Sequence, residues 1–234
     1  DKKGNNISNK NPYYGEYTFH YWIWKNYIDH IKTNWVGFCQ YRKFFLKKDS
    51  LKRDIKFEEL KNLVISNVED DGKFDCILGN KFSVQNYKFT KILKNYFLKF
   101  LLNPHLFFNK KKKNLKLHFD LYHGKGNLET AIEFLDEKNR ISFTNYMETQ
   151  TSFHPHNMFI CKTSLLKSYY DEIFPWLEKC EKEFGFDNLK GYGLQRIYGF
   201  LAERFLSYWF TQKAKVREFP IIVKDLSDYK NLKE

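Results

Sequence analysis

The fold is decided by a short apolar run that ends in polar and charged residues: Asn34-Trp35-Val36-Gly37-Phe38-Cys39-Gln40-Tyr41-Arg42-Lys43-Phe44-Phe45. Its first half, positions 35–39, has the length and composition of a buried strand. In an open α/β sheet, ligands bind beyond the carboxyl ends of the strands. We therefore expect Gln40, Tyr41 and Arg42 to contact a ligand, and the planar guanidinium of Arg42 suits a phosphate group.

An aromatic helix is predicted to precede this strand. Asn11 is a favourable N-cap and Pro12 a favourable first helical residue. The apolar residues that follow, as far as Ile28, cover nearly every face, so the helix is expected to be buried. Its N-terminus, with Lys10 and the polar loop 4–8 beside it, would suit a diphosphate. The alternative is an ordinary capped core helix that binds no anion.

Several ordered motifs carry a family resemblance. They are Gly4-Asn5-Asn6-Ile7-Ser8-x-Lys10-Asn11-Pro12, Glu16, Tyr21-Trp22-x-Trp24-Lys25-Asn26, Val36-Gly37-Phe38-Cys39-Gln40-Tyr41-Arg42-Lys43-Phe44, Asn157-Met158-Phe159-Ile160-Cys161 and Gln195-Arg196-x-x-Gly199-Phe200-Leu201-Ala202-Glu203-Arg204-Phe205-Leu206. This set resembles a family of bacterial capsular and exopolysaccharide glycosyltransferases, formerly catalogued as a domain of unknown function. The resemblance implies an α/β fold: a GT-A-like (Rossmann-like) mixed sheet flanked by helices, in a single glycosyltransferase domain over residues 1–234.

The sequence departs from the family pattern on the side expected to hold the nucleotide. Asn5 stands where the family usually has Asp, Gln40 where it has His, and Lys43 where it has Arg. Members of the family generally begin with a strand that helps to hold the nucleotide, and no such strand is visible before Asp1. We therefore expect the sequence to be a piece of a longer protein, without the first strand of the family.

The sequence also differs from GT-A transferases at the position where those enzymes bind a metal ion. Those transferases usually carry an Asp-x-Asp pair after the corresponding strand, where two carboxylates hold a divalent ion. The same place here reads Gln40-Tyr41-Arg42. We expect no metal cofactor, with the cations of Arg42 and Lys10 in its place. Mn²⁺ or Mg²⁺ bound elsewhere is the alternative.

The densest cluster of metal-ligating residue types is His118-x-Asp120-x-x-His123. Two imidazoles and a carboxylate are suitable ligands for a divalent ion, and Asp120 is alternatively a candidate base. Gly124 and Gly126 just beyond it suggest a loop. Surface or capping roles for these residues are the alternative reading.

Two further segments supply candidate site residues. His154 and His156 flank a proline just before the apolar strand expected at 158–161, so only one of the two is expected to face a site. In the helix expected from Leu194 onward, Glu203 lies off the apolar stripe together with the residues at 196, 199 and 207. Glu203 therefore either meets solvent or lines a cleft. A helix is also expected at 57–64 and a strand at 74–78.

Composition and charge favour an anionic partner. The 234 residues have a formal net charge of +12, which suits a nucleotide diphosphate, an anionic lipid, an acidic glycan or nucleic acid. No signal peptide or long apolar run is visible, so a cytoplasmic location is expected. The four widely spaced cysteines are expected to be buried reduced thiols.

A basic amphipathic helix is expected from Lys91 to Leu101, and a run of lysines follows at 110–113. Such a segment can lie on an anionic membrane surface, which would place the protein on the inner face of the cell membrane as a peripheral protein. The alternative, which we favour, is a core helix followed by a solvated loop.

We interpret the sequence as a glycosyltransferase that moves a sugar from a nucleotide diphosphate donor to a capsular or lipid-linked polysaccharide. The resemblance implies UDP as the carrier, with galactofuranose as one of several candidate sugars. The candidate residues are Glu203 or Asp120 for catalysis; Asn6, Lys10, Asn11, Gln40, Tyr41 and Arg42 for the nucleotide; His118, His123, His156, Asn157 and Arg196 for further substrate contacts; and His118, Asp120 and His123 for a metal, if one binds.

Two other classes of protein remain as alternatives. Asn5 and Gln40 are compatible with a catalytically inactive glycan-binding domain. The positive charge and exposed aromatics would also suit a basic nucleic-acid-binding protein. Because the aromatics fall mainly on apolar helix faces, and no RNP, KH or arginine-rich motif is present, we expect no nucleic-acid partner.

Overall fold

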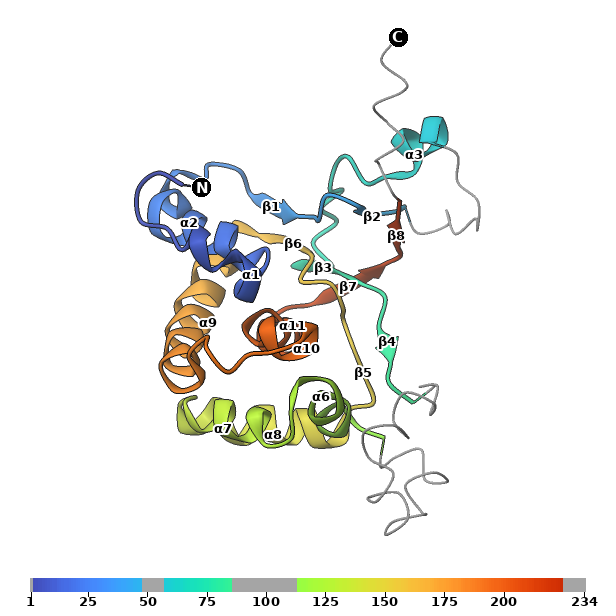
Figure 1. Ribbon diagram of the computed structural model, residues 1–234. Helices are drawn as coiled ribbons and strands as arrows, with labels where there is room; N and C mark the ends of the chain where they lie inside the picture. The colour runs from blue at the N-terminus through green and yellow to red at the C-terminus, as the bar shows by residue number, and fades with distance from the viewer. Residues whose placement is uncertain (1, 48–56, 86–112, 225–234) are drawn as a thin grey trace.

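The computed structural model describes residues 2–47, 57–85 and 113–224. Its centre is a four-stranded sheet of β1 (Trp35–Phe38), β6 (Phe159–Lys162), β3 (Cys76–Gly79) and β7 (Val216–Phe219), in that order (Figure 1). β6 runs antiparallel to both of its neighbours, and β3 pairs with β7 in parallel. The carboxyl ends of β1 and β3 therefore lie at the same edge of the sheet as the beginning of β6.

Two small ribbons extend this edge. β2 (Lys43–Phe45) pairs with β8 (Ile221–Val223), and β4 (Phe82–Ser83) pairs with β5 (Ser152–Phe153). β2 follows β1 after a four-residue connection that contains the polar end of the opening run. The mixed sheet with its flanking helices confirms the expected α/β class.

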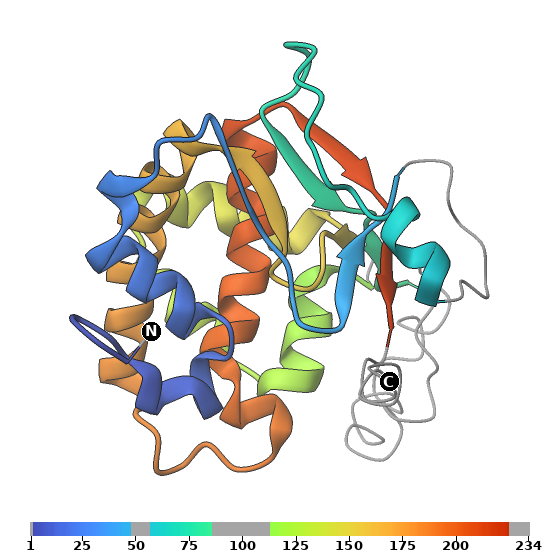
Figure 2. The ribbon, with the colours of Figure 1, turned by 90° about the horizontal axis from the view of Figure 1, so that it is seen from above.

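The helices gather around α11 (Ile197–Lys213), which runs through the middle of the helical layer (Figure 2). Its neighbours are α1 (Asn11–Tyr14), α8 (Glu137–Thr149) and α9 (Thr163–Phe184). The remaining helices are α2 (Tyr17–Asn26), α3 (Phe57–Leu63), α6 (Leu115–His123), α7 (Asn127–Glu133) and α10 (Tyr192–Gln195), with short 3₁₀ turns η1 (Ser8–Lys10) and η2 (Ile28–His30).

The main core lies between the sheet and these helices and is rich in aromatic side chains. Phe159 of β6 packs against Tyr169 and Phe210, with ring centroids 5.8 and 5.0 Å apart. Buried phenols are paired with polar partners, as where the Tyr17 hydroxyl lies 2.5 Å from the Tyr169 hydroxyl. Such pairing removes the cost of burying an unsatisfied hydroxyl. This core fixes α11, which carries part of the site.

The predicted helix after Asn11 is broken, which corrects the sequence-based expectation. Gly15 adopts a φ of +59° and separates α1 from α2. Lys10, not Asn11, occupies the N-cap, and the Asn11 side chain donates instead to the Gly15 carbonyl at 3.0 Å and to Thr18 Oγ1 at 3.2 Å. The expectation of burial on nearly every face is also wrong, because Phe19 is 45% exposed.

Other expected elements have mixed outcomes. The strands expected at 74–78 and 158–161 and the helix at 57–64 are confirmed as β3, β6 and α3. β1 is also present, but it is an edge strand and none of its residues is fully buried. The helix expected from Leu194 is divided at Arg196 into α10 and α11.

The cysteine expectation holds for three of the four residues. Cys76, Cys161 and Cys180 are buried and unpaired, whereas Cys39 is exposed. The basic helix expected at 91–101 lies outside the described residues, as does most of the lysine run that follows it. Among the helices that the structure describes, none has the length and apolar character needed to cross a membrane.

Candidate functional site

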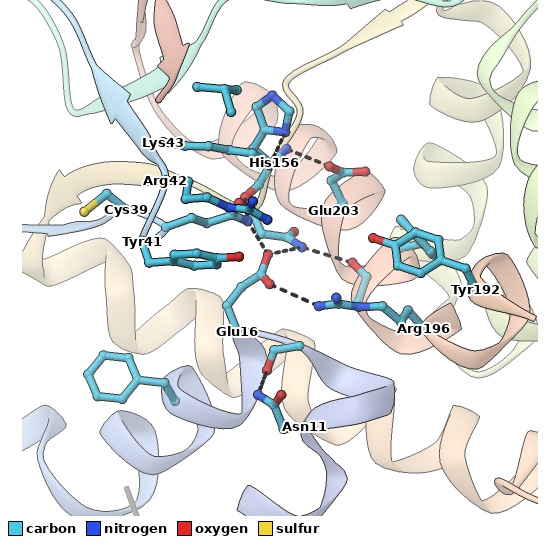
Figure 3. A pocket seen from close by; sticks show the side chains of 17 residues that line it. Asn11, Glu16, Cys39, Tyr41, Arg42, Lys43, His156, Tyr192, Arg196 and Glu203 are labelled. Atoms are coloured by element: carbon cyan, nitrogen blue, oxygen red, sulfur yellow. Dashed lines mark hydrogen bonds and ion pairs between the residues drawn. The ribbon is translucent and has the colours of Figure 1, made fainter. Parts of the chain in front are cut away.

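A cavity of about 860 Å³ opens where β1 ends and β6 begins (Figure 3). It lies at the carboxyl end of β1, the place where open α/β sheets bind ligands. Four segments that are distant in the sequence form most of its walls: the α1–α2 junction, the connection from β1 to β2, the turn before β6, and the segment from α10 into α11. The polar and aromatic side chains that line it include Glu16, Gln40, Tyr41, Arg42, Lys43, His156, Asn157, Tyr192, Arg196, Phe200 and Glu203.

Glu16 lies on the floor of the cavity and links three of its walls. One carboxylate oxygen, Oε1, accepts hydrogen bonds from Gln40 Nε2 at 2.7 Å and from Asn157 Nδ2 at 3.1 Å. The other oxygen lies 3.7 Å from Arg196 Nη2. Gln40 also donates to the His156 carbonyl at 2.6 Å. Gln40, Asn157 and Arg196 therefore serve at least in part to hold Glu16 and the floor in place.

The backbone of Gly15 makes this arrangement possible. A Cβ atom at Gly15 would lie 2.2 Å from Arg196 Nη2, and its φ of +59° also disfavours a side chain. Gly199 plays a similar part on α11, because a Cβ there would lie 3.3 Å from the Tyr14 carbonyl oxygen. The Gly199 carbonyl accepts a hydrogen bond from Asn157 Nδ2 at 3.1 Å. These two glycines allow α1 to approach α11 closely.

Glu203 projects from α11 into the cavity, with 13% of its side chain exposed. Its Oε1 accepts a hydrogen bond from the His156 backbone N–H at 2.6 Å. Its Oε2 lies 2.5 Å from Nη1 of Arg204, which is only 2% exposed. A carboxylate held on both oxygens has one defined orientation, and this one faces the cavity. The cleft reading of Glu203 is therefore confirmed over the solvent reading.

A buried cluster behind Glu203 supports it. The Arg204 guanidinium lies 3.6 Å from the centroid of the Phe153 ring, and Nη2 lies 3.2 Å from His118 Nδ1. Because arginine only donates, Nδ1 of His118 accepts and the ring is neutral. Burial lowers the pKa of His118 well below its usual value, and the charge of Arg204 lowers it further. The neutral His118 ring therefore adds no charge beside Arg204. The negative charge that pairs with Arg204 comes from Glu203.

His156 and Asn157 form a tight turn in front of β6. Both have left-handed backbone conformations, with φ values of 84° and 52°, which are uncommon for residues other than glycine. This turn directs the His156 N–H to Glu203 and places the imidazole Nδ1 3.0 Å from Lys43 Nζ. Burial and the neighbouring Lys43 lower the pKa of His156. As expected, only one histidine of the pair faces the site, since His154 is buried against the Gly79 carbonyl.

Three cationic side chains line the cavity: Arg42, Lys43 and Arg196. They outnumber the two carboxylates, Glu16 and Glu203, so the cavity is positive overall. Arg42 is exposed, and its guanidinium lies 4.7 Å from the centroid of the Tyr41 ring. Burial lowers the pKa of Lys43, while Glu16 and Glu203 act in the opposite direction. The site thus has the charge needed to attract a phosphate-bearing ligand.

Two residues expected to bind the nucleotide lie elsewhere. Lys10 forms an ion pair of 2.6 Å with Glu181 of α9 and does not line the cavity. Asn6 shapes its own loop, because it donates to the Gly4 carbonyl at 2.9 Å and accepts from the Ser8 N–H at 3.2 Å. Both side chains have local partners that account for their positions. We therefore remove Lys10 and Asn6 from the candidate site, whereas Asn11 remains at the wall of the cavity.

The predicted cluster at 118–123 lies on α6, and the expected loop follows it at 124–126. The three side chains have separate partners, which differ from one to the next. His118 contacts Arg204, and His123 Nδ1 donates to the Gly193 carbonyl at 2.9 Å. Asp120 accepts from the Gly126 N–H at 3.4 Å. None of them lines the cavity. Within residues 2–47, 57–85 and 113–224, no group of three His, Cys, Asp or Glu side chains is placed to hold a metal ion.

Glu16, Lys43 and Tyr192 are cavity residues that the sequence analysis did not select for the site. Glu16 gave a usable signal, because it is an acidic residue inside a strongly apolar helical segment and belongs to one of the family motifs. Lys43 gave a weaker signal as a departure from the family pattern. Tyr192 gave none, since it lies between two glycines far along the chain from β1.

Comparison with known proteins gives a family and a similar structure. The profile of the family "Domain of unknown function (DUF4422)" matches residues 1–214. A solved structure described as the bifunctional glycosyltransferase WbbM in its apo form superposes with a TM-score of 0.69 at 22% sequence identity. The match covers 96% of this chain and 39% of that one, so the chain spans well under half the length of its structural relative. No curated protein matches the sequence.

At this level of identity the structural match establishes a shared fold and no more. The family match is stronger, because it covers nearly all of the chain, from the polar loop before α1 through Glu203 and to the end of α11. All of the cavity residues except Val223 fall within the matched range. The protein therefore belongs to the DUF4422 family.

Proposed function

We propose that this protein is a glycosyltransferase that moves a sugar from a nucleotide diphosphate to a glycan acceptor. The observation that carries the proposal is the cavity at the end of β1, in which a firmly oriented carboxylate, Glu203, faces cationic side chains. A diphosphate leaving group needs positive charge beside it, and a reacting hydroxyl needs a base. The shared fold with a glycosyltransferase supports this proposal.

Arg42 and Lys43 are proposed to bind the diphosphate. The acceptor hydroxyl gives its proton to the carboxylate of Glu203 while its oxygen forms a bond with the anomeric carbon of the donor sugar. The bond between that carbon and the β-phosphate oxygen breaks, and the nucleotide diphosphate leaves with the electron pair. Arg42 and Lys43 stabilise the negative charge that develops on the leaving group.

The finer assignments follow from the sequence resemblance and the charge of the chain. UDP is proposed as the nucleotide, with galactofuranose as one candidate sugar, and a capsular or lipid-linked polysaccharide as the acceptor. A net charge of +12 would favour contact with an anionic membrane surface, where lipid-linked acceptors are found. The proposed location is cytoplasmic, on the inner face of the membrane.

Nucleotide binding can be tested without knowing the acceptor, because Cys39 lines the cavity and is exposed. Burial raises the pKa of the other three thiols, Cys76, Cys161 and Cys180, so they react slowly with alkylating reagents. Alkylation by N-ethylmaleimide, followed by mass spectrometry, should therefore report on Cys39. UDP is expected to protect Cys39, and equal alkylation rates with and without saturating UDP would argue against the proposed site.

Replacing Arg42 by alanine should weaken UDP binding by roughly ten- to hundredfold, because a charge-assisted contact to phosphate contributes about 1.5 to 3 kcal/mol. Calorimetric titration with UDP, together with protection of Cys39, measures the change. The matched control is Arg140→Ala, which removes an arginine from the surface of α8 outside the cavity. Equal UDP affinity in the Arg42→Ala and Arg140→Ala variants would remove Arg42 from the site.

We propose that the diphosphate is bound without a metal ion, because in the resemblance to GT-A enzymes Gln40, Tyr41 and Arg42 stand where those enzymes usually carry a carboxylate pair. UDP affinity should therefore survive EDTA, and manganese should change it less than about twofold. The titration is repeated with EDTA, magnesium and manganese for the parent protein and for Asp120→Asn. Loss of affinity on chelation, restored by manganese only in the parent, would move the phosphate site to the 118–123 segment.

An inactive glycan-binding domain is the second candidate. Gln40, which replaces the histidine usual in the family, is engaged with Glu16 and with the His156 backbone. Gln40 thus stabilises the floor of the cavity, whereas a histidine there could take part in a reaction. Its presence would fit a site that binds a glycan without turnover. Hydrolysis of UDP-galactose and UDP-glucose separates the candidates, because an inactive domain would bind saccharide and release no UDP.

A further inference from the structure

Two tyrosines face the cavity from opposite walls. Tyr41, in the connection between β1 and β2, is 75% exposed, and Tyr192, at the start of α10, is 69% exposed. They are the most exposed aromatic side chains in the described part of the chain. Figure 3 shows Tyr41 beside Arg42 on one side and Tyr192 beside Arg196 on the other, with Glu16 between them. Large exposed aromatic rings at a cavity mark binding surfaces.

The backbone around Tyr192 is fixed although its ring is exposed. Gly191, the N-cap of α10, has a φ of +83°, a conformation that favours glycine. A Cβ at Gly193 would lie 2.1 Å from the Tyr122 carbonyl oxygen, so α10 packs directly on the backbone of α6. His123 reinforces this contact through its hydrogen bond to the Gly193 carbonyl. Tyr192 is thus presented to the cavity by a firmly held segment.

The neighbours of Tyr192 form an amphipathic platform. Its ring meets Phe200 edge to face, with centroids 5.8 Å apart at 71°. The Arg196 guanidinium lies 5.7 Å from the centroid of the Tyr192 ring. An exposed ring beside a guanidinium suits a saccharide, which offers an apolar C–H face to the free face of the ring and hydroxyls to the arginine. A phosphate would gain nothing from the ring.

We infer that Tyr192, Arg196 and Phe200 form a saccharide-binding subsite that receives the acceptor glycan. The subsite is called the acceptor subsite because of the proposed function, in which Arg42 and Lys43 hold the donor on the opposite wall. Glu203 and Tyr192 come from the same α10–α11 segment, so a sugar stacked on Tyr192 lies on the side of the carboxylate that takes its proton. The donor and the acceptor then enter from different walls and meet at Glu203.

Saturation-transfer NMR with simple glycosides tests this inference directly. The probes are methyl β-D-galactopyranoside and methyl α-D-glucopyranoside, and the proteins are the parent, Tyr192→Ala, Tyr192→Phe and Tyr27→Ala. Tyr27 is 46% exposed and lies outside the cavity, so it is a matched control. At least one glycoside should bind the parent, Tyr192→Phe and Tyr27→Ala. In Tyr192→Ala its signal should fall about fivefold, since stacking on an aromatic ring is lost.

UDP distinguishes this subsite from the donor site. It should not displace the glycoside from the parent, and calorimetry should give Tyr192→Ala a UDP affinity within about twofold of the parent. Displacement by UDP, an equal glycoside signal in Tyr192→Ala, or no glycoside binding to the parent would each overturn the inference. Failure of UDP to bind the parent, with glycoside binding retained and dependent on Tyr192, would instead overturn the proposed function and leave the saccharide subsite standing.

Discussion

The Glu203→Gln variant should lose activity by a factor of about 10² to 10⁴, the range expected when a general base is removed. Glutamine keeps an oxygen that can accept from the His156 N–H, and it keeps the size of the side chain, but it cannot take a proton from the acceptor hydroxyl. Release of UDP from UDP-galactose or UDP-glucose, whichever the parent uses, measures the rate. The loss should be in kcat more than in KM, because the donor binds on the opposite wall.

Asp120→Asn is the matched control for this experiment. Asp120 was the other catalytic carboxylate suggested by the sequence, yet it lies on α6, caps the Gly126 N–H and does not line the cavity. Its activity should remain close to that of the parent. If Asp120→Asn were inactive and Glu203→Gln active, the reacting carboxylate would have been assigned to the wrong helix. Protection of Cys39 by UDP shows in each variant that the cavity is still formed.

The sequence predicted those elements whose apolar pattern is local. The strands at β1, β3 and β6 are short apolar runs bounded by turn residues, and they form where expected. The break at Gly15 was missed because two factors combine there: the φ of +59° ends α1, and the Arg196 side chain, 181 positions away, occupies the space where a Cβ would lie. Periodicity along a single segment carries no information about such a contact.

The faces of α11 show a second limit. Its apolar stripe placed Glu203 correctly away from the core, yet Ser207 on the same side is fully buried. Ser207 Oγ accepts from the His154 N–H at 2.9 Å and contacts the Tyr146 hydroxyl at the same distance. A polar residue can be buried wherever another segment supplies its hydrogen bonds. The helix is therefore enclosed on more faces than its hydrophobic pattern indicates.

The candidate site was predicted only where sequence neighbours are also spatial neighbours. Gln40, Tyr41 and Arg42 reach the cavity because they directly follow β1. The histidines of α6 looked like metal ligands because they are close in sequence, but the helix turns them to different partners. Lys10 looked like a phosphate ligand because it is a cation beside a helix start. Its partner Glu181 lies 171 positions away, and no local pattern indicates that ion pair.

Replacing Arg204 by methionine should lower the free energy of unfolding by about 3 kcal/mol, the lower end of the cost of breaking a buried ion pair. The lower end is expected because Glu203 is partly exposed to the cavity and can be hydrated. Methionine also loses the stacking on Phe153 and the bond to His118. Urea unfolding followed by tryptophan fluorescence measures the change.

Arg217→Met provides the matched control. Arg217 also lies over a phenylalanine, 3.9 Å from the centroid of Phe74, and also pairs with a carboxylate, Asp71, at 2.8 Å. Its side chain is 33% exposed, so the same interactions are screened by water and their loss should lower the stability clearly less than the change at Arg204. Equal losses of stability in the Arg204→Met and Arg217→Met variants would show that burial does not strengthen the ion pair between Arg204 and Glu203.

A double-mutant cycle then tests whether Arg204 acts through Glu203. Each single change leaves one ionic partner uncompensated, whereas Glu203→Gln combined with Arg204→Met leaves no buried charge. The double variant should therefore be more stable than the sum of the single losses predicts, with a coupling energy of about 1 to 3 kcal/mol. Additive losses would mean that Arg204 stabilises the fold through contacts other than Glu203, such as those with Phe153 and His118. In that case the orientation of Glu203 would depend on the His156 N–H, and activity should survive Arg204→Met.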